Sequence, residues 1–225
     1  MKLSKRLYAC AQTLWPRYLQ HPFVREMAEG TLPVEKFRFY MLQDSIYLRD
    51  YMKILAAILL KSDDFEEMRF LCGEMSNTIE ETFRTHIPYM KQLGIPEAEL
   101  RETAAHIDNS AYTQYMLCTA QAGDVLTGLV LLLNCSWSYA YIAEKMAERY
   151  AGAVGRESYS AWFSAYLSVS YRQANQALID RIDGMAGDIR EERVRQLCEI
   201  FEKCCLFELR FWDAVYAGKN DTERF

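Results

Sequence analysis

The strongest constraint on the fold is the three-and-four spacing of apolar residues along segments that contain neither glycine nor proline. Between Pro33 and Lys61, one such segment places its apolar and aromatic side chains on a single helical face. No window of strict alternation bounded by turn residues is long enough for a strand. The chain is therefore predicted to be all-α, and long helices with short connections favour an up-and-down helical bundle.

Prolines, glycines and capping residues divide the chain into the expected helices. Helices are predicted at residues 3–19, 23–29, 34–61, 65–94 with a bend near Pro88, a short acidic segment after Pro96, 109–121, 125–152, 157–185 and 189–216. The run Ser62-Asp63-Asp64 and the single residue Asp124 are expected to supply the N-caps of two of them. No linker or repeat marks a second domain, so residues 1–225 are predicted to form one domain.

Composition limits the classes of partner. A net charge of -5 with acidic and basic residues interspersed argues against a nucleic-acid or anionic membrane surface, and favours small-molecule or protein partners. The seven cysteines show no CxxC pair and are expected to be reduced. The N-terminus lacks the apolar core of a signal peptide, and the longest apolar run is far short of the ~20 residues of a membrane span, so a soluble, cytoplasmic protein is predicted.

Three polar side chains interrupt apolar helical faces: Asp44, Cys135 and Glu208. Burying a carboxylate costs several kcal/mol unless it is paired, hydrogen-bonded or protonated. Each residue alone has a structural explanation, because buried cysteines are common and a buried glutamate is often ion-paired. The occurrence of all three in one chain instead favours a polar site inside the bundle.

Tyrosines supply candidate walls for that site. The chain has 15 tyrosines, and five of them are candidates to line such a pocket: Tyr47, Tyr51, Tyr112, Tyr139 and Tyr166. Their rings are suited to stack on a planar ligand while their hydroxyl groups bind its edges. A heteroaromatic substrate is therefore expected.

The three histidines exclude one class of bundle site. A di-iron centre needs Glu-x-x-His pairs, and the residues three positions before His21, His86 and His106 are Tyr18, Phe83 and Thr103. A haem site with one axial histidine stays open. No glycine-rich phosphate loop is present. The remaining chemistry is a thiol nucleophile assisted by carboxylates and phenols.

Four segments resemble the TenA family, also called thiaminase II or aminopyrimidine aminohydrolase. They are HPFVREMAEGTLPVEKFRFYMLQDSIYL (residues 21–48), SAYTQYM (110–116), LLNCSWSYAYIAEKM (132–146) and CLFELRFWDAVY (205–216). They follow the family's order over nearly the whole chain. The Cys-x-Trp-x-Tyr pattern of Cys135, Trp137 and Tyr139 resembles the branch that carries an active-site cysteine.

This resemblance implies a haem-oxygenase-like helical bundle, a homotetramer, and hydrolysis of thiamin breakdown products in pyrimidine salvage. The implied substrate is 4-amino-5-aminomethyl-2-methylpyrimidine, which becomes the hydroxymethylpyrimidine with loss of ammonia, and thiamin is cleaved more slowly. The resemblance implies no metal and no organic cofactor. An alternative of another class is a non-catalytic aminopyrimidine-binding or regulatory protein.

The resemblance also assigns roles to individual residues. Cys135 matches the nucleophile, Glu208 the acid/base, Asp44 a substrate-binding carboxylate and Tyr47 the phenol that assists the cysteine. The remaining candidate pocket residues are Tyr51, Tyr112, Tyr139 and Tyr166. The sequence departs from the family pattern at Asn134, where a proline is frequent, and at Ser170, where an acidic residue is expected.

Overall fold

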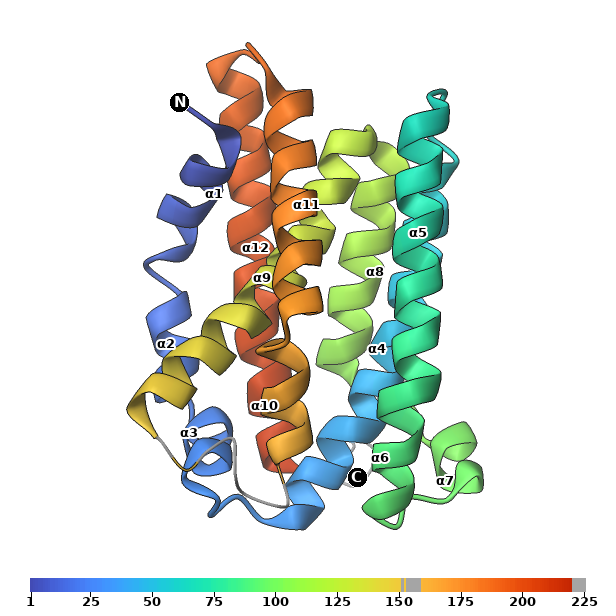
Figure 1. The fold of residues 1–225 in the computed structure, drawn as a ribbon, viewed down its shortest axis with the longest axis vertical. Helices are drawn as coiled ribbons and strands as arrows, with labels where there is room; N and C mark the ends of the chain where they lie inside the picture. The colour runs from blue at the N-terminus through green and yellow to red at the C-terminus, as the bar shows by residue number, and fades with distance from the viewer. Residues whose placement is uncertain (151, 153–158, 220–225) are drawn as a thin grey trace. The chain divides into compact units, whose positions relative to one another are not determined.

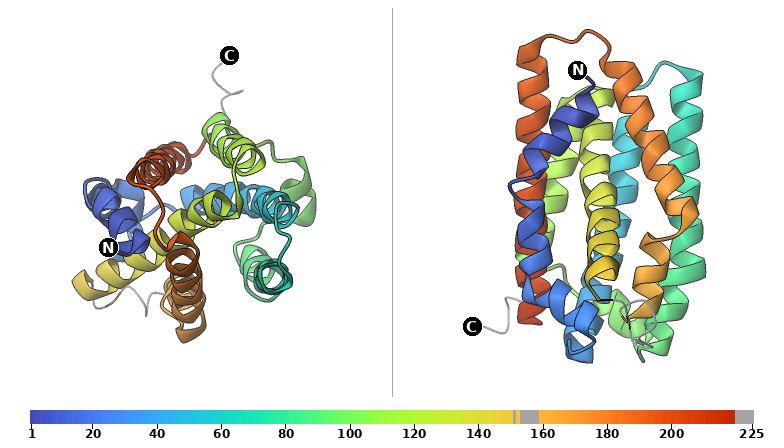
Figure 2. Two further views of the ribbon diagram at one scale, coloured as in Figure 1. Left: turned by 90° about the horizontal axis from the view of Figure 1, so that it is seen from above. Right: turned by 60° about the vertical axis from the view of Figure 1, so that its left-hand side comes forward.

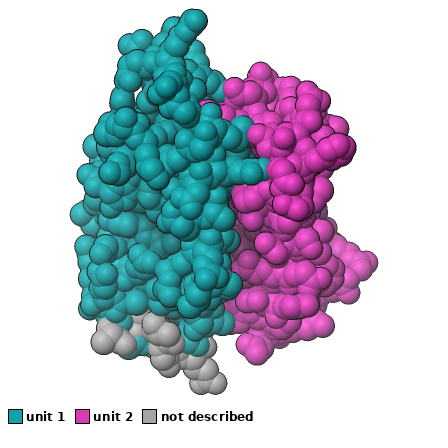
Figure 3. All heavy atoms as spheres, turned by 45° about the horizontal axis from the view of Figure 1, so that its top comes forward, with its two compact units in different colours: residues 1–32, 129–213 teal, residues 33–128, 214–225 magenta. Residues whose placement is uncertain are grey.

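The computed structural model describes residues 1–150, 152 and 159–219, and every regular element in these ranges is a helix (Figure 1). The prediction of an all-α protein is confirmed. Contacts group the chain into two compact units, which Figure 3 colours separately. Unit 1 holds Met1–Leu32 and Leu129–Asp213, and unit 2 holds Pro33–Gly128 and the residues from Ala214. The single domain stays a prediction.

Unit 1 consists of helices from both ends of its sequence. These are α1 (Leu3–Ala11), α2 (Trp15–Gln20), α3 (Pro22–Glu29), most of α9 (Val125–Arg149), α10 (Ser160–Tyr166), α11 (Val169–Ala186) and most of α12 (Glu191–Ala217). Helix α11 contacts both α1 and α10, and a short turn joins it to α12 (Figures 1 and 2). The core of the unit is aromatic, with Trp15, Tyr18 and Trp212 almost fully buried.

Unit 2 is built around α4 (Val34–Leu59). Its other elements are α5 (Phe65–Glu81), the π-helix η1 (Thr82–His86), α6 (Ile87–Gln92), α7 (Glu97–Glu102) and α8 (Ile107–Ala122). Helix α4 packs against α5 and α8, and the three helices lie side by side in Figures 1 and 2. The apolar face predicted for α4 is buried, including Phe37, Tyr40 and Ile54.

Side-chain caps begin the helices where the sequence predicts them. The Asp64 carboxylate accepts a hydrogen bond of 2.8 Å from the Glu67 N–H at the start of α5. Asp124 accepts from the Thr127 N–H at 2.8 Å at the start of α9. Each cap satisfies a backbone donor that has no partner inside the helix. Both predicted N-caps are therefore confirmed.

Two predicted helices are wrong because each is divided. Residues 3–19 form α1 and α2, separated by a turn at 12–14, and Pro16 lies in the first turn of α2, where its missing N–H costs nothing. The predicted helix 157–185 begins outside the described residues, and its described part is α10 and α11. Ser168 starts α11 by accepting a hydrogen bond from the Tyr171 N–H at 3.1 Å.

The bend predicted near Pro88 is a π-helix. The Ile87 N–H donates to the carbonyl of Thr82, five residues earlier, instead of to the usual fourth residue. Pro88 has no N–H, and its ring would crowd the carbonyl of Arg84 in a regular α-helix. The wider turn relieves that conflict and allows the helical path to continue into α6.

Helix α9 is the one helix in the described residues that has the length and hydropathy of a membrane span. In its most apolar 18-residue window, 78% of the residues are buried inside the structure. Such burial is typical of the core helix of a soluble protein, and length with composition alone is weak support for a span.

A close approach between helices generates a stability prediction. A Cβ at Gly128 in α9 would lie 2.3 Å from Cγ1 of the fully buried Ile58 in α4, so Gly128→Ala forces one of the helices to move. We expect a destabilisation of about 1–3 kcal/mol, as for other overpacked sites. Thermal unfolding of the purified variant measures it.

The matched control is Gly73→Ala in α5, where a Cβ would meet nothing within 4 Å. This variant should be stabilised by about 0.5–1 kcal/mol, because alanine restricts the unfolded chain and favours helix. Equal increases in Tm for the two variants would show that Ile58 gives way freely.

Candidate active site

Asp44 of α4 is a buried carboxylate in unit 2, as its place in the apolar face predicts. Asp44 is only 5% exposed to solvent. Oδ2 lies 3.4 Å from Nδ1 of His86, the last residue of the π-helix. The geometry is that of an ion pair without a well-aligned hydrogen bond, since Oδ2 has no hydrogen-bond partner. His86 therefore supplies the compensation that a buried carboxylate needs.

The pKa of His86 reflects this pairing. Burial lowers the pKa of His86, but the adjacent Asp44 carboxylate and the charge of Glu81 raise it above its ordinary value. Burial in turn raises the pKa of Glu81. The folded state thus favours the imidazolium, and its stabilising contribution is complete below the unfolded pKa and is lost as pH rises through the folded pKa.

Three of the predicted tyrosines gather in unit 2. The ring of Tyr47 lies 5.5 Å from that of Tyr112 and 6.1 Å from that of Tyr51. The Tyr47 hydroxyl donates to the sulfur of Met116 at 3.6 Å. Tyr47 and Tyr112 are buried, and Tyr51 is half-buried. Helices α4 and α8 therefore form an aromatic wall next to the turn that carries Asp44.

A fully buried glutamine fixes the two helices of this wall in register. The side-chain oxygen of Gln43, Oε1, accepts hydrogen bonds from the His106 backbone N–H at 2.8 Å and from Asn109 Nδ2 at 3.1 Å. Its Nε2 donates to the Ala104 carbonyl at 3.0 Å. Sequence reasoning missed this residue because it looked for charged groups and thiols, although Gln43 directly precedes Asp44.

Cys135 and Glu208 both lie in unit 1. Cys135 of α9 is half-buried, whereas Glu208 of α12 is 2% exposed. Glu208 influences two neighbouring groups, the Cys204 thiol one turn earlier in α12 and the Tyr18 hydroxyl of α2. Burial first, and then the charges of Cys205 and Glu208, raise the pKa of both groups. No disulfide joins any of the seven cysteines in the structure.

An aromatic wall also occurs in unit 1. The ring of Tyr139, one turn after Cys135, lies 5.0 Å from Tyr166 and 5.4 Å from Trp212. Trp162 lies 4.6 Å from Tyr166 and closes the group. Tyr139 and Tyr166 are thus brought together as expected, while the two tryptophans were not predicted as site residues. The indole rings of these tryptophans make the wall less polar than a wall of tyrosines alone would be.

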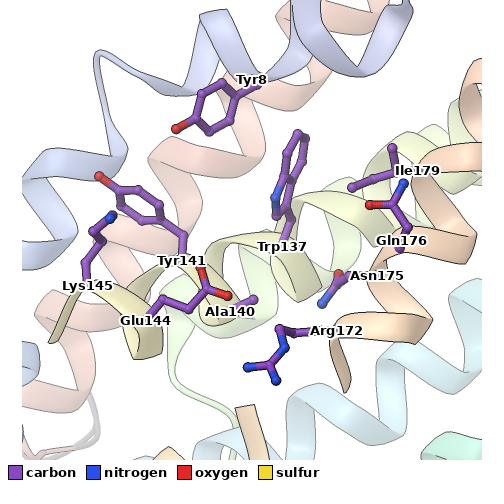
Figure 4. Close-up of a pocket in the computed structure, with 10 residues that line it drawn as sticks. All are labelled: Tyr8, Trp137, Ala140, Tyr141, Glu144, Lys145, Arg172, Asn175, Gln176 and Ile179. Carbon is purple, nitrogen blue, oxygen red and sulfur yellow. The ribbon is translucent and has the colours of Figure 1, made fainter. Parts of the chain in front are cut away.

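Trp137, the middle residue of the Cys-x-Trp-x-Tyr pattern, belongs to a different surface. Its ring packs 5.4 Å from Tyr8 and 5.5 Å from Trp15. It lines a surface hollow of about 390 Å³ together with Tyr8, Tyr141, Arg172 and Asn175 (Figure 4). None of the predicted site residues lines this hollow.

The described residues contain no group of three or more histidine, cysteine, aspartate or glutamate side chains that could hold a metal ion. The donor atoms present are carboxylates, a thiol and phenols on separate helical faces. The fold and these side chains define an all-helical protein with two aromatic walls, each next to a buried carboxylate.

Comparison with known proteins identifies the family. Residues 8–218 match the TENA/THI-4/PQQC family, and the chain belongs to it. It is 33% identical to an aminopyrimidine aminohydrolase from Halalkalibacterium halodurans, over 96% of each chain. A TenA homologue from P. horikoshii OT3 superimposes with a TM-score of 0.87 at 30% identity, covering 97% of this chain and all of the other.

A third likeness concerns the fold alone. A domain with a haem-oxygenase-like fold from Shewanella denitrificans aligns over 96% of this chain with a TM-score of 0.70 at 15% identity. The sequence predicted the TenA family, a haem-oxygenase-like fold and an enzyme, and these three predictions are confirmed. The roles of the individual site residues stay predictions.

The ion pair in unit 2 yields a testable pKa. Asp44→Asn removes the charge that raises the pKa of His86, while burial still lowers it. We therefore expect the pKa of His86 to fall below its ordinary value in the variant, as measured by NMR titration of the imidazole.

His21 is the internal control for this titration. Burial lowers its pKa, and its partner is Asp213 at 3.1 Å. The pKa of His21 should stay unchanged in Asp44→Asn. An unchanged pKa of His86 would contradict the assigned pairing with Asp44.

Proposed function

We propose that this protein hydrolyses 4-amino-5-aminomethyl-2-methylpyrimidine to the hydroxymethylpyrimidine and ammonia in thiamin pyrimidine salvage, and cleaves thiamin more slowly. The observation that carries the proposal is the pair Cys135 and Glu208, a half-buried thiol and a buried carboxylate in one unit beside an aromatic wall. A protein that only binds an aminopyrimidine needs no nucleophile. The curated relative from Halalkalibacterium halodurans, named an aminohydrolase, supports this choice.

In the proposed first half-reaction, the Cys135 thiol gives its proton to the 5-aminomethyl nitrogen of the substrate, and the Cys135 sulfur adds to an electron-poor ring carbon of the pyrimidine. Glu208, acting as an acid, protonates a ring nitrogen, so that the dearomatised adduct carries no full negative charge. The ring electron pair then expels the protonated 5-methylene amine as ammonia. This step leaves an exocyclic methylene group on the ring, and the Cys135 sulfur is still bonded to the ring carbon that it attacked.

In the second half-reaction, water adds to the exocyclic methylene carbon and gives its proton to the Glu208 carboxylate. The carbon–sulfur bond then breaks as the ring becomes aromatic again, and the proton on the ring nitrogen returns to the released sulfur, which restores the Cys135 thiol. The net change is replacement of an amine by a hydroxyl group. Glu208 alternates between acid and base, which is the usual behaviour of a group that serves two half-reactions.

The roles predicted for Asp44, Tyr47, Tyr51 and Tyr112 stay predictions. The same holds for the homotetramer and for the cytoplasmic location that the sequence implies. The alternative is a non-catalytic aminopyrimidine-binding or regulatory protein, which would bind the pyrimidine without releasing ammonia.

The first test measures ammonia release from the aminopyrimidine by purified protein, with thiamin as a second substrate. Wild-type protein should release one ammonia per pyrimidine consumed. Cys135→Ser should bind the pyrimidine but lose nearly all turnover, because a serine hydroxyl without a strong base is a far poorer nucleophile than a thiolate.

Cys118→Ser is the matched control, since it removes one exposed thiol from α8. It should keep wild-type kcat. Near-normal turnover of Cys135→Ser would refute the covalent mechanism, and tight binding by wild type without ammonia release would favour the non-catalytic alternative.

Glu208→Gln tests the acid/base role. The amide keeps the shape and hydrogen-bonding capacity of the side chain but cannot exchange a proton, so kcat should fall by about two to four orders of magnitude while substrate binding persists. A purely structural Glu208 would behave differently: the melting temperature would fall, and kcat per folded molecule would stay nearly constant. Measuring kcat and Tm on the same preparation decides between the two roles.

A further inference from the structure

Cys135 lies between two residues that are each tied to another helix. Asn134, before it, reaches α12, and the backbone carbonyl of Ser136, after it, is bound from α11. All of these residues belong to unit 1. The thiol itself is only half-buried, so apolar packing alone does not define its position.

The Asn134 side chain is fully buried and crosses to α12. Its Nδ2 donates to the Phe201 carbonyl at 3.1 Å and to the Cys205 sulfur at 3.0 Å. The Phe201 carbonyl can only accept, so the amide nitrogen must face it. The other amide atom, Oδ1, is buried and has no hydrogen-bond partner. An apolar residue would avoid that orphaned oxygen, so packing does not explain why an amide is present.

The contact of Asn134 falls on the part of α12 that leads to Glu208. Cys205 precedes Glu208 by less than one helical turn, so the two side chains lie on neighbouring parts of the same face. The Tyr18 hydroxyl holds the same turn by donating to the Cys205 carbonyl at 2.8 Å. Asn134 therefore sets the register of the helix of the thiol against the helix of the carboxylate.

The other flank is held from α11. The Tyr171 hydroxyl donates to the Ser136 carbonyl at 3.0 Å, and Asn175 Nδ2 donates to the same oxygen at 3.3 Å. Figure 4 shows Asn175 on α11 beside the α9 segment that carries Trp137. The ring of Tyr171 also contacts Tyr166 edge-on at 5.0 Å, which links this anchor to the aromatic wall.

We propose that Asn134 and Tyr171 are positioning residues that hold Cys135 in its reactive orientation by anchoring its two chain neighbours to α12 and α11. This inference rests on the proposed function. Neither residue takes part in proton transfer. Instead, they determine where the Cys135 sulfur lies. Turnover is sensitive to that position, because a misplacement of about 1 Å can lower the rate about 100-fold.

The test uses Asn134→Leu and Tyr171→Phe in the full chain. Asn134→Leu keeps the branched shape but removes the bridge, and kcat per folded molecule should fall about 10- to 100-fold with KM changed by less than about 3-fold. Tm is measured on the same preparation, which separates a loss of kcat from a loss of folded protein. Tyr171→Phe removes one hydroxyl and keeps the ring, with an expected loss of about 3- to 10-fold in kcat.

The matched control is Tyr150→Phe, near the C-terminal end of α9. It also removes one tyrosine hydroxyl with a hydrogen bond in unit 1, to Glu29 at 3.1 Å, but it is distant from Cys135 along the helix. Its kcat should equal that of wild type. A loss of kcat in all three variants that merely follows the loss of folded protein would overturn the proposal.

A second readout does not depend on turnover. Iodoacetamide alkylation of Cys135, followed by mass spectrometry of its peptide, should be at least about 3-fold faster in both anchor variants, because a released α9 segment exposes the half-buried thiol more often. The exposed Cys118 is the internal reference and should react at an unchanged rate. Faster alkylation in a protein that shows no hydrolysis would support the anchors while refuting the proposed function. Unchanged alkylation or unchanged kcat in an active enzyme would overturn the anchors.

Discussion

Hydrogen bonds from buried polar side chains to the backbone of another helix determine how the helices of this protein fit together. Apolar faces bring helices into contact, but smooth apolar surfaces allow them to slide and rotate with little change in energy. A buried amide tolerates no such movement, because losing its partner costs the full desolvation of the group. Gln43 does this for α4 and α8, and Asn134 for α9 and α12. The candidate site residues Asp44 and Cys135 are the immediate chain neighbours of these two amides.

The two units use their buried carboxylates differently. Asp44 lies 3.4 Å from the imidazole of His86 and raises the pKa of that imidazole. Glu208 lies near the Cys204 thiol and the Tyr18 hydroxyl. Burial and the Glu208 charge both raise the pKa of these two groups. The first carboxylate therefore faces an imidazole whose protonated form it favours, whereas the second lies near groups that stay protonated at neutral pH. A binding role for Asp44 and a proton-transfer role for Glu208 stay predictions.

Most of the helices could be predicted from the sequence because periodicity, caps and breakers are local signals. Asp64, within the capping run that the sequence predicts, and Asp124 both begin helices. The divided helices were missed where the signal was ambiguous: Pro16 is compatible with a first turn, and Ser168 resembles any exposed serine until its capping bond is seen. His86 was missed for another reason. Periodicity identifies a buried carboxylate within its own helix, but the partner comes from a distant segment and lies where no sequence rule points.

The π-helix at Thr82–His86 constrains the number of residues in this segment as well as their types. A π-turn holds one residue more than an α-turn, so everything after it is rotated by about 100° relative to a regular continuation. Removing a single residue from this segment would bring back the conflict between Pro88 and the preceding turn, and it would turn the imidazole of His86 away from Asp44. Deletions are therefore disfavoured here, even though none of the five residues in the turn is itself fully buried.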